Sequence, residues 1–247
     1  MRRLAILILV LAITPLSAKA WLHAADQRIA RKSAAMAPPD LRLVLGLYIR
    51  EYEGGLREAE AGEGTESHYF LVRSLRGKLR QRIEAQTAAT IAGLRHGEPL
   101  SRIAERLGEL AHLLADANNP FHIANDDPRL ALSQSDFERY FENRMSVFPT
   151  VFYGLDPNFQ LLPYLDRTFA RTSRFYPLMS EEYFRYGERR TSADFDDRST
   201  AFGVASVCYS HAVTDLVNIY YYIWKEAGGD VRSASTMRRS TLILHAN

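Results

Sequence analysis

Apolar residues recur at helical spacing along most of the chain, whereas the strict alternation of apolar and polar residues that is typical of strands is scarce. Two short stretches, Pro38-Pro39 and Gly54-Gly55, are expected to end the first two helices. The pattern predicts helices over residues 22–37, 40–53, 75–97, 101–117, 133–145 and about 201–227, with shorter ones between about 161 and 186. No repeat, linker or low-complexity segment separates these helices, so we predict one all-α domain, a single-domain helical bundle, over residues 21–229, followed by a tail over 230–247.

The first twenty residues have a different pattern. Arg2 and Arg3 precede an apolar run over residues 4–16 that is too short to span a bilayer, and Ala18-Lys19-Ala20 is a small-x-small cleavage site. We interpret residues 1–20 as a secretory signal peptide that is removed, which predicts a secreted or periplasmic protein beginning at Trp21. The alternative is an uncleaved membrane anchor, which Pro15 and the A-x-A ending disfavour.

Composition and charge narrow the function. The chain has 247 residues, 47% hydrophobic and 24% charged, which suffices for a sizeable core. Loss of residues 1–20 would remove three basic residues and no acid, and would change the formal net charge from +2 to about −1. No strong attraction to nucleic acid is implied, and the absence of a Gly-rich phosphate loop leaves an ATP-using function without support. The only cysteine, Cys208, cannot form an intrachain disulfide, so core packing or metal must stabilise the fold.

The candidate chemistry lies in "AHLLADANNPFHIAND", residues 111–126. His112 and Asp116 are four residues apart and therefore share one face of a largely apolar helix. A buried carboxylate is costly unless it is paired or bound to a cation, and an imidazole with a carboxylate suits zinc. The helix should end at Asn118-Asn119-Pro120 and return His122 to the same end. Taken alone, however, the His112 and Asp116 spacing is more often a surface pair or a buried hydrogen bond.

Together these residues resemble the bacterial zinc-dependent phospholipase C superfamily, which shares its fold with the single-strand-specific zinc nucleases. The resemblance extends from Trp21 to about Glu142 and is vaguer afterwards. It rests on a tryptophan at the expected new N-terminus, a histidine on the first helix, a histidine-aromatic element, and the pattern H-x-x-x-D-x-x-x-x-P-x-H. These are Trp21, His23, His68-Tyr69-Phe70, and the set His112, Asp116, Pro120 and His122.

The resemblance implies that zinc ions are held by separate segments of the chain. His68, His112 and Asp116 would bind one ion. Trp21, through its α-amino group, would bind a second ion with His23 and Asp116, so that Asp116 bridges the two. The α-amino group can do so near neutral pH because its ordinary pKa is about 7.7–8.0.

A third zinc ion would use His122 and Glu138, but Gln134 stands where the family has a histidine. Since a neutral amide is a poor zinc ligand, we expect two zinc ions and a weak or empty third site. In "GLYIRE", Glu51 takes the place of the family's aspartate on the second helix, as a ligand, a general base or both; nearby Glu53 is the alternative.

The resemblance implies a zinc-dependent phosphodiesterase that hydrolyses phospholipids with metal-activated water, in which Glu51 and Asp116 are the catalytic candidates. We expect it to be a monomer. No integral membrane segment is expected after processing. Two alternatives remain open. One is a single-strand-specific nuclease or nucleotidase that uses the same metals, with nucleic acid as substrate only. The other is a non-catalytic exported zinc-binding protein, which Gln134 favours.

Three features of the second half have simpler explanations. His211 and Asp215 repeat the i, i+4 spacing and are expected to form a buried hydrogen-bonded pair. The aromatic run over residues 218–224 is expected in the core. The Phe- and Tyr-rich segment over residues 137–186, which includes Phe152 and Tyr153, is a candidate lining for a substrate cleft.

Overall fold

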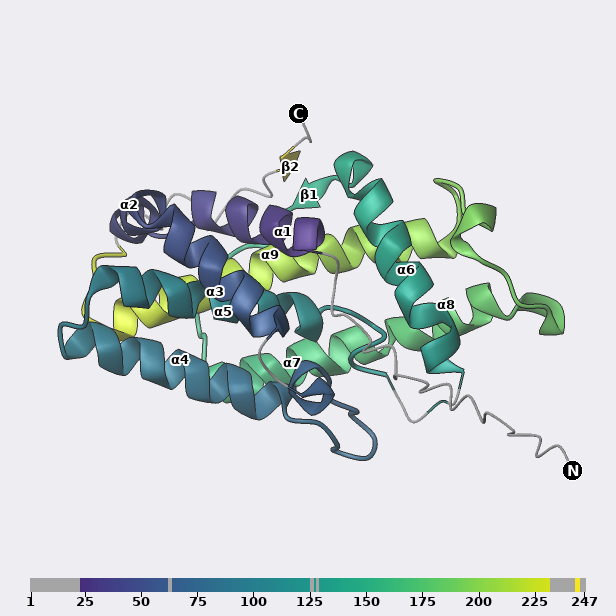
Figure 1. Ribbon diagram of the computed structural model, residues 1–247, viewed down its shortest axis with the longest axis horizontal. Helices are drawn as coiled ribbons and strands as arrows, with labels where there is room; N and C mark the ends of the chain where they lie inside the picture. Colours follow the sequence, from purple (N-terminus) through teal and green to yellow (C-terminus); the bar gives the residue numbers. More distant parts are fainter. Residues whose placement is uncertain (1–22, 62–63, 125–126, 128, 232–242, 245–247) are drawn as a thin grey trace, which may run out of the picture.

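The computed structural model describes residues 23–61, 64–124, 127, 129–231 and 243–244. Helices make up most of this part of the chain (Figure 1), so the all-α prediction is confirmed. The α-helices are α1 (His23–Ala35), α2 (Pro39–Leu47), α3 (Ile49–Ala61), α4 (Leu79–Arg95), α5 (Leu100–Ala117), α6 (Leu130–Arg144), α7 (Leu161–Ser173), α8 (Phe175–Tyr183) and α9 (Thr200–Glu226). Short 3-10 turns are η1 (Thr65–His68), η2 (Met145–Val147), η3 (Arg185–Gly187) and η4 (Ser192–Asp194).

The long helix α9 forms the centre of the bundle. It runs along the length of the molecule in Figure 1, and α1, α4, α5 and α8 pack against it. The Ser199 hydroxyl caps its first turn by accepting a hydrogen bond from the Phe202 amide at 3.2 Å. Most of its residues from Ala201 to Ile223 are buried, as expected for a helix that is apolar nearly all round. The prediction that the aromatic run belongs to the core is confirmed for Tyr220 and Tyr221.

Helices α3 and α5 pack unusually closely, and this contact corrects one prediction. Gly54-Gly55 does not end a helix: α3 continues to Ala61. A Cβ atom on Gly55 would lie 1.9 Å from the Glu105 carbonyl oxygen, and one on Gly108 would lie 1.9 Å from that of Tyr52. The two glycines therefore allow the backbones to touch, and the contact outweighs their low helix propensity.

The predicted helix over residues 40–53 is also interrupted. The chain leaves helical geometry at Tyr48, which has φ −110° and ψ 38° and separates α2 from α3. This break turns the direction of the chain, so α2 lies at one end of α1 while α3 packs along α5 (Figure 1). Among the described helices, none combines the length and the apolar character needed to cross a bilayer.

Two further predictions concern the ends and the aromatic segment. Residues 1–20 and Trp21 lie outside the described residues. In the predicted tail, β2 (Ile243–Leu244) pairs antiparallel with β1 (Thr150–Val151). Within the aromatic segment, Phe141, Phe148 and Phe152 are buried in the core, whereas Tyr153 is exposed and Phe159 lines a cavity with Tyr221 and Tyr222.

Candidate metal centre

The candidate centre is built at the end of α5. From Leu110 to Ala117 every residue of α5 is buried, including His112 and Asp116. The Asn118 side-chain amide donates to the Leu114 carbonyl at 3.0 Å and so ends the helix. The next turn is closed by Asn119, whose side-chain oxygen accepts from the Phe121 amide and whose carbonyl accepts from the His122 amide, each at 3.0 Å. This turn returns His122 to Asp116, as the Asn-Asn-Pro break predicts.

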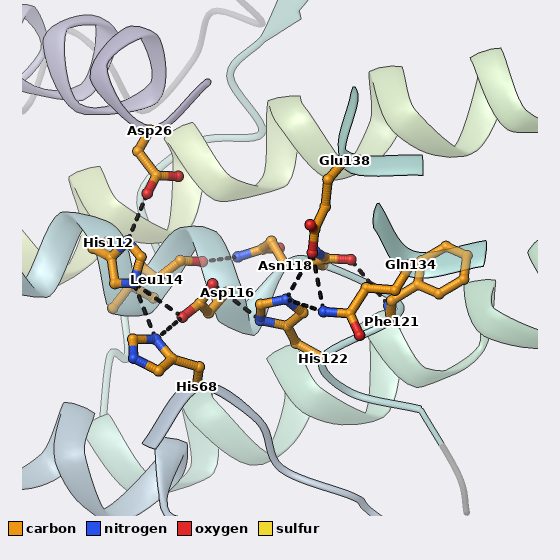
Figure 2. Close-up of polar contacts among 11 residues, drawn as sticks. Asp26, His68, His112, Leu114, Asp116, Asn118, Phe121, His122, Gln134 and Glu138 are labelled. Carbon is orange, nitrogen blue, oxygen red and sulfur yellow. Dashed lines mark hydrogen bonds and ion pairs between the residues drawn. The ribbon is translucent and has the colours of Figure 1, made fainter. Parts of the chain in front are cut away.

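Three side chains from two segments converge on one point (Figure 2). The Nδ1 atom of His68, at the end of η1, lies 2.9 Å from the Oδ2 atom of Asp116 and 3.1 Å from the Nε2 atom of His112. The third side of this triangle, from His112 Nε2 to Asp116 Oδ2, is 3.4 Å. Tetrahedral nitrogen and oxygen ligands at about 2.0–2.1 Å from zinc lie about 3.3 Å apart, so these three atoms have the spacing of metal ligands. The group His68, His112 and Asp116 could bind a metal ion.

The structure adds Asp26, which the sequence analysis missed. Its Oδ2 atom lies 2.6 Å from His112 Nδ1, with both side chains buried (Figure 2). A carboxylate on the far nitrogen of a metal-binding histidine fixes the orientation of the ring and leaves Nε2 for the ion. The signal was present in the sequence, because Asp26 is three and four residues before Ile29 and Ala30 and so lies on the buried face of α1.

A second group lies on the other side of Asp116. His122 Nδ1 is 3.0 Å from Asp116 Oδ1, and His122 Nε2 is 3.3 Å from the Oε1 atom of Glu138 on α6. Gln134, one turn before Glu138, places its side-chain nitrogen 3.1 Å from His122 Nε2 and donates to Glu138 Oε1 at 3.0 Å. Asp116 therefore directs one oxygen to His68 and the other to His122, whereas the resemblance implied a bridge toward Trp21 and His23. Gln134 occupies the predicted position beside His122 and Glu138.

The charges of the cluster are strongly coupled. Burial alone would lower the pKa of His112, but the carboxylates of Asp116 and Asp26 outweigh it and raise the pKa to about 9. Burial would also lower the pKa of His122, but the carboxylates of Asp116 and Glu138 outweigh it and raise the pKa to about 10. Burial would raise the pKa of Asp116, yet the His112 and His122 imidazoles hold it well below its ordinary value. The buried carboxylates thus demand positive charge, which protons or a cation can supply.

The remaining predicted residues are placed as follows. Trp21 lies outside the described residues. His23 is the first residue of α1 and its side chain lies outside the described part, but Asp26, one turn later, reaches the cluster. Glu51 is exposed in the first turn of α3, and η1 with His68 follows the opposite end of that helix (Figure 1). The structure therefore does not bring Glu51 to the cluster. Its alternative, Glu53, instead accepts a hydrogen bond from Arg31 at 2.6 Å.

His211 and Asp215 do not form the predicted hydrogen-bonded pair. Asp215 is buried and accepts hydrogen bonds from Tyr164 at 2.7 Å, Asn118 at 3.0 Å and Arg171 at 2.5 Å. The His211 ring stacks on Tyr153, with 4.3 Å between the ring centroids. Since Asn118 caps α5, Asp215 connects the end of α5 to α7 and α9, which is a structural role.

Comparison with known proteins identifies a similar fold. No family model and no curated protein matches the sequence. Among solved structures, the alpha-toxin of Clostridium perfringens, isolated from avian strain SWCP, is similar, with a TM-score of 0.61 and 14% sequence identity. The match covers 84% of this chain and 65% of the toxin chain, so this chain spans less than two thirds of its length. The chain therefore has the all-α fold of this toxin, as the resemblance implied.

Proposed function

We propose that this protein is an exported zinc-dependent phosphodiesterase that hydrolyses phospholipids in the manner of a phospholipase C. The observation that carries the proposal is the buried triangle of His68, His112 and Asp116, whose edges of 2.9, 3.1 and 3.4 Å suit a tetrahedral ion. The fold shared with alpha-toxin and the motif between His112 and His122 both support it.

The donor set fits zinc in a second way. Asp116 Oδ1 and His122 Nδ1 are buried 3.0 Å apart, yet neither makes a hydrogen bond within the described residues. Buried polar atoms without hydrogen bonds are rare unless an ion or a water satisfies them. Asp116 would thus bridge an ion held with His68 and His112 and a second one. The start of α1 lies at the cluster through Asp26, which supports Trp21 and His23 as the remaining ligands of that second ion.

Each residue has a distinct task in this proposal. His68 and His112 bind through neutral imidazoles, Asp26 holds the His112 ring, and Asp116 contributes one oxygen to each side. When bound, two divalent ions supply an acidified water and positive charge for the oxygens of a phosphodiester. No serine or cysteine nucleophile is required, and Cys208 is buried with its pKa raised to about 12 by burial.

The test is phosphocholine release from phosphatidylcholine micelles by the processed protein, with and without a chelator. We expect release that a chelator abolishes and zinc restores. Asp116→Asn should abolish it, whereas Glu105→Gln, the same chemical change at a half-buried position of α5 where the carboxylate pairs with Arg102, should leave it unchanged. Absence of chelator-sensitive release would refute the phospholipase proposal, and digestion of single-stranded DNA or RNA in its place would favour the nuclease.

One observation favours the non-catalytic alternative. Gln134, His122 Nε2 and Glu138 contact one another at 3.0–3.3 Å without an ion, so this side of the His122 ring already has hydrogen-bond partners. A protein that binds zinc through the first triangle alone would show metal in elemental analysis and no turnover of any phosphodiester. Hydrolysis together with three zinc ions per chain would exclude it.

A further inference from the structure

A hairpin over residues 71–76 connects η1 to α4 and extends beyond the surrounding helices (Figure 1). Its two arms form an antiparallel bridge between Leu71 and Arg76, with a 2.8 Å hydrogen bond from the Leu71 amide to the Arg76 carbonyl. The Leu75 amide closes the turn on the Leu71 carbonyl, also at 2.8 Å. Leu75 is 71% exposed at this turn.

The backbone at Leu75 is strained. Its φ of +56° is left-handed, and among the described residues it is the one non-glycine residue with positive φ. Side chains with a Cβ atom adopt this region at a cost in free energy that glycine avoids, as Gly77 does nearby with φ +96°. Leu75 is not part of the core. At an exposed position with positive φ, a smaller or polar residue would be more favourable than leucine. Strain of this kind commonly marks a functional segment.

Basic residues surround this exposed leucine. Residues 64–80 contain four of them, Arg73, Arg76, Lys78 and Arg80, and a single acid, Glu66. Arg80 is neutralised by Glu84 at 2.9 Å and Asp166 at 2.7 Å. Lys78 lies 3.1 Å from Glu66, but both side chains are about 60% exposed, so solvent weakens the pair. An apolar tip flanked by cations suits the surface of a phospholipid bilayer, where the leucine enters the acyl boundary and the cations meet anionic head groups.

The hairpin is joined directly to the metal centre. His68 ends η1 only three residues before Leu71, and the Phe70 amide donates to the His122 carbonyl at 2.9 Å. Phe70 also packs on Phe169 of α7, with ring centroids 5.0 Å apart. His68 is 12% exposed, whereas His112 and Asp116 are fully buried, so the described part of the cluster meets solvent on the hairpin side.

We propose that the 71–76 hairpin is an interfacial anchor that docks the protein on anionic phospholipid bilayers and brings the His68 side of the metal centre to the lipid head groups. The inference rests on the proposed function for its substrate, but the docking itself needs no turnover. Leu75 supplies the apolar contact, and Arg73 and Lys78 supply the charge.

The test is flotation of the processed protein with vesicles of phosphatidylcholine mixed with phosphatidylglycerol. Leu75→Ser should lower binding about tenfold, because it removes most of a leucine side chain from the lipid contact. The matched control is Leu47→Ser, which removes a 78% exposed leucine from α2 and should change binding less than about twofold. Circular dichroism melting of both variants checks that each is folded.

Charge is tested separately by Arg73→Glu, with Arg50→Glu, at an exposed position of α3, as its control. Only Arg73→Glu should weaken binding to the anionic vesicles and reduce its salt dependence. Equal losses for Leu75→Ser and Leu47→Ser would overturn the proposal. The proposal would also be overturned if Leu75→Ser abolished a dimer in sedimentation velocity without changing vesicle binding. The hairpin would then be a contact with a second copy of the chain.

The two proposals fail separately. Vesicle binding that depends on Leu75, without hydrolysis of any phosphodiester, would refute the enzyme and keep the anchor. Hydrolysis of a soluble phosphodiester by a protein that does not float with vesicles would refute the anchor and keep the enzyme.

Discussion

Replacement of Asp26 by asparagine tests whether metal binding at the candidate centre depends on a residue that would not touch the ion. The contact between Asp26 Oδ2 and His112 Nδ1 is 2.6 Å long, and both side chains are buried. Asparagine keeps the shape and can still accept the hydrogen bond, but it removes the charge that makes the ring nitrogen opposite a better donor to the metal. Loss of such a partner lowers metal affinity about 10–100-fold, or about 1.4–2.7 kcal/mol.

The assay is competition for zinc with a chromophoric chelator near neutral pH, on wild-type protein and on two variants. Glu53→Gln is the control, because it removes one carboxylate that contacts α1 through Arg31 without touching the cluster. We expect weaker zinc binding for Asp26→Asn only, together with a lower His112 pKa in the metal-free protein, since Asp26 helps to raise that pKa. Zinc affinities within about threefold of wild type for both variants would refute the reasoning.

Three other predictions follow from the same geometry. Gln134→His should raise the zinc content by about one ion per chain in elemental analysis, because the new imidazole would join a histidine and a carboxylate already in place; an unchanged content would contradict this. Gly108→Ala should lower the free energy of unfolding by about 2 kcal/mol or more, because the new Cβ would meet the Tyr52 carbonyl. Gly203→Ala, which has open space around it, should raise the free energy of unfolding by up to about 1 kcal/mol. Denaturant titration measures both values. Zinc affinity should fall as pH falls below about 9, by about tenfold per pH unit for each displaced proton, because His112 must lose the proton that its raised pKa favours. Calorimetric titrations with zinc across this pH range measure the affinity. A zinc affinity that does not change with pH would show that no proton is released.

The sequence indicated the part of the site that lies on a single helix. His112 and Asp116 share a face, and the apolar residues around them predicted that both would be buried, which the structure confirms. Asp26 was not predicted as a site residue because an acid in the first turn of a helix is ordinarily explained by the helix dipole. Only the packing of α1 against α5 distinguishes a buried partner of His112 from such a residue.

The glycine pair shows the same limit for the fold. Gly54-Gly55 is a strong local signal for the end of a helix, and the identical residues also permit two helices to touch. Which effect prevails depends on whether another helix passes at that point, and the partner, Glu105, is fifty residues away in the sequence. The position of Glu51 relative to the cluster likewise depends on the direction of α3, which the break at Tyr48 sets.

The candidate metal centre draws on segments that are far apart in the chain. Asp26 on α1 is 86 residues from its partner His112, and His68 is 48 residues from Asp116. None of these segments holds the buried charges at a favourable energy alone, because each carboxylate needs imidazoles or a cation that other segments supply. An ion bound there would connect α1, η1 and α5 at one point in a chain whose single cysteine forms no disulfide, and its binding free energy would add to the stability of the folded state. Metal binding and folding are therefore expected to be coupled in this protein, so the residues that would activate a phosphodiester also secure the packing of the helices that position them.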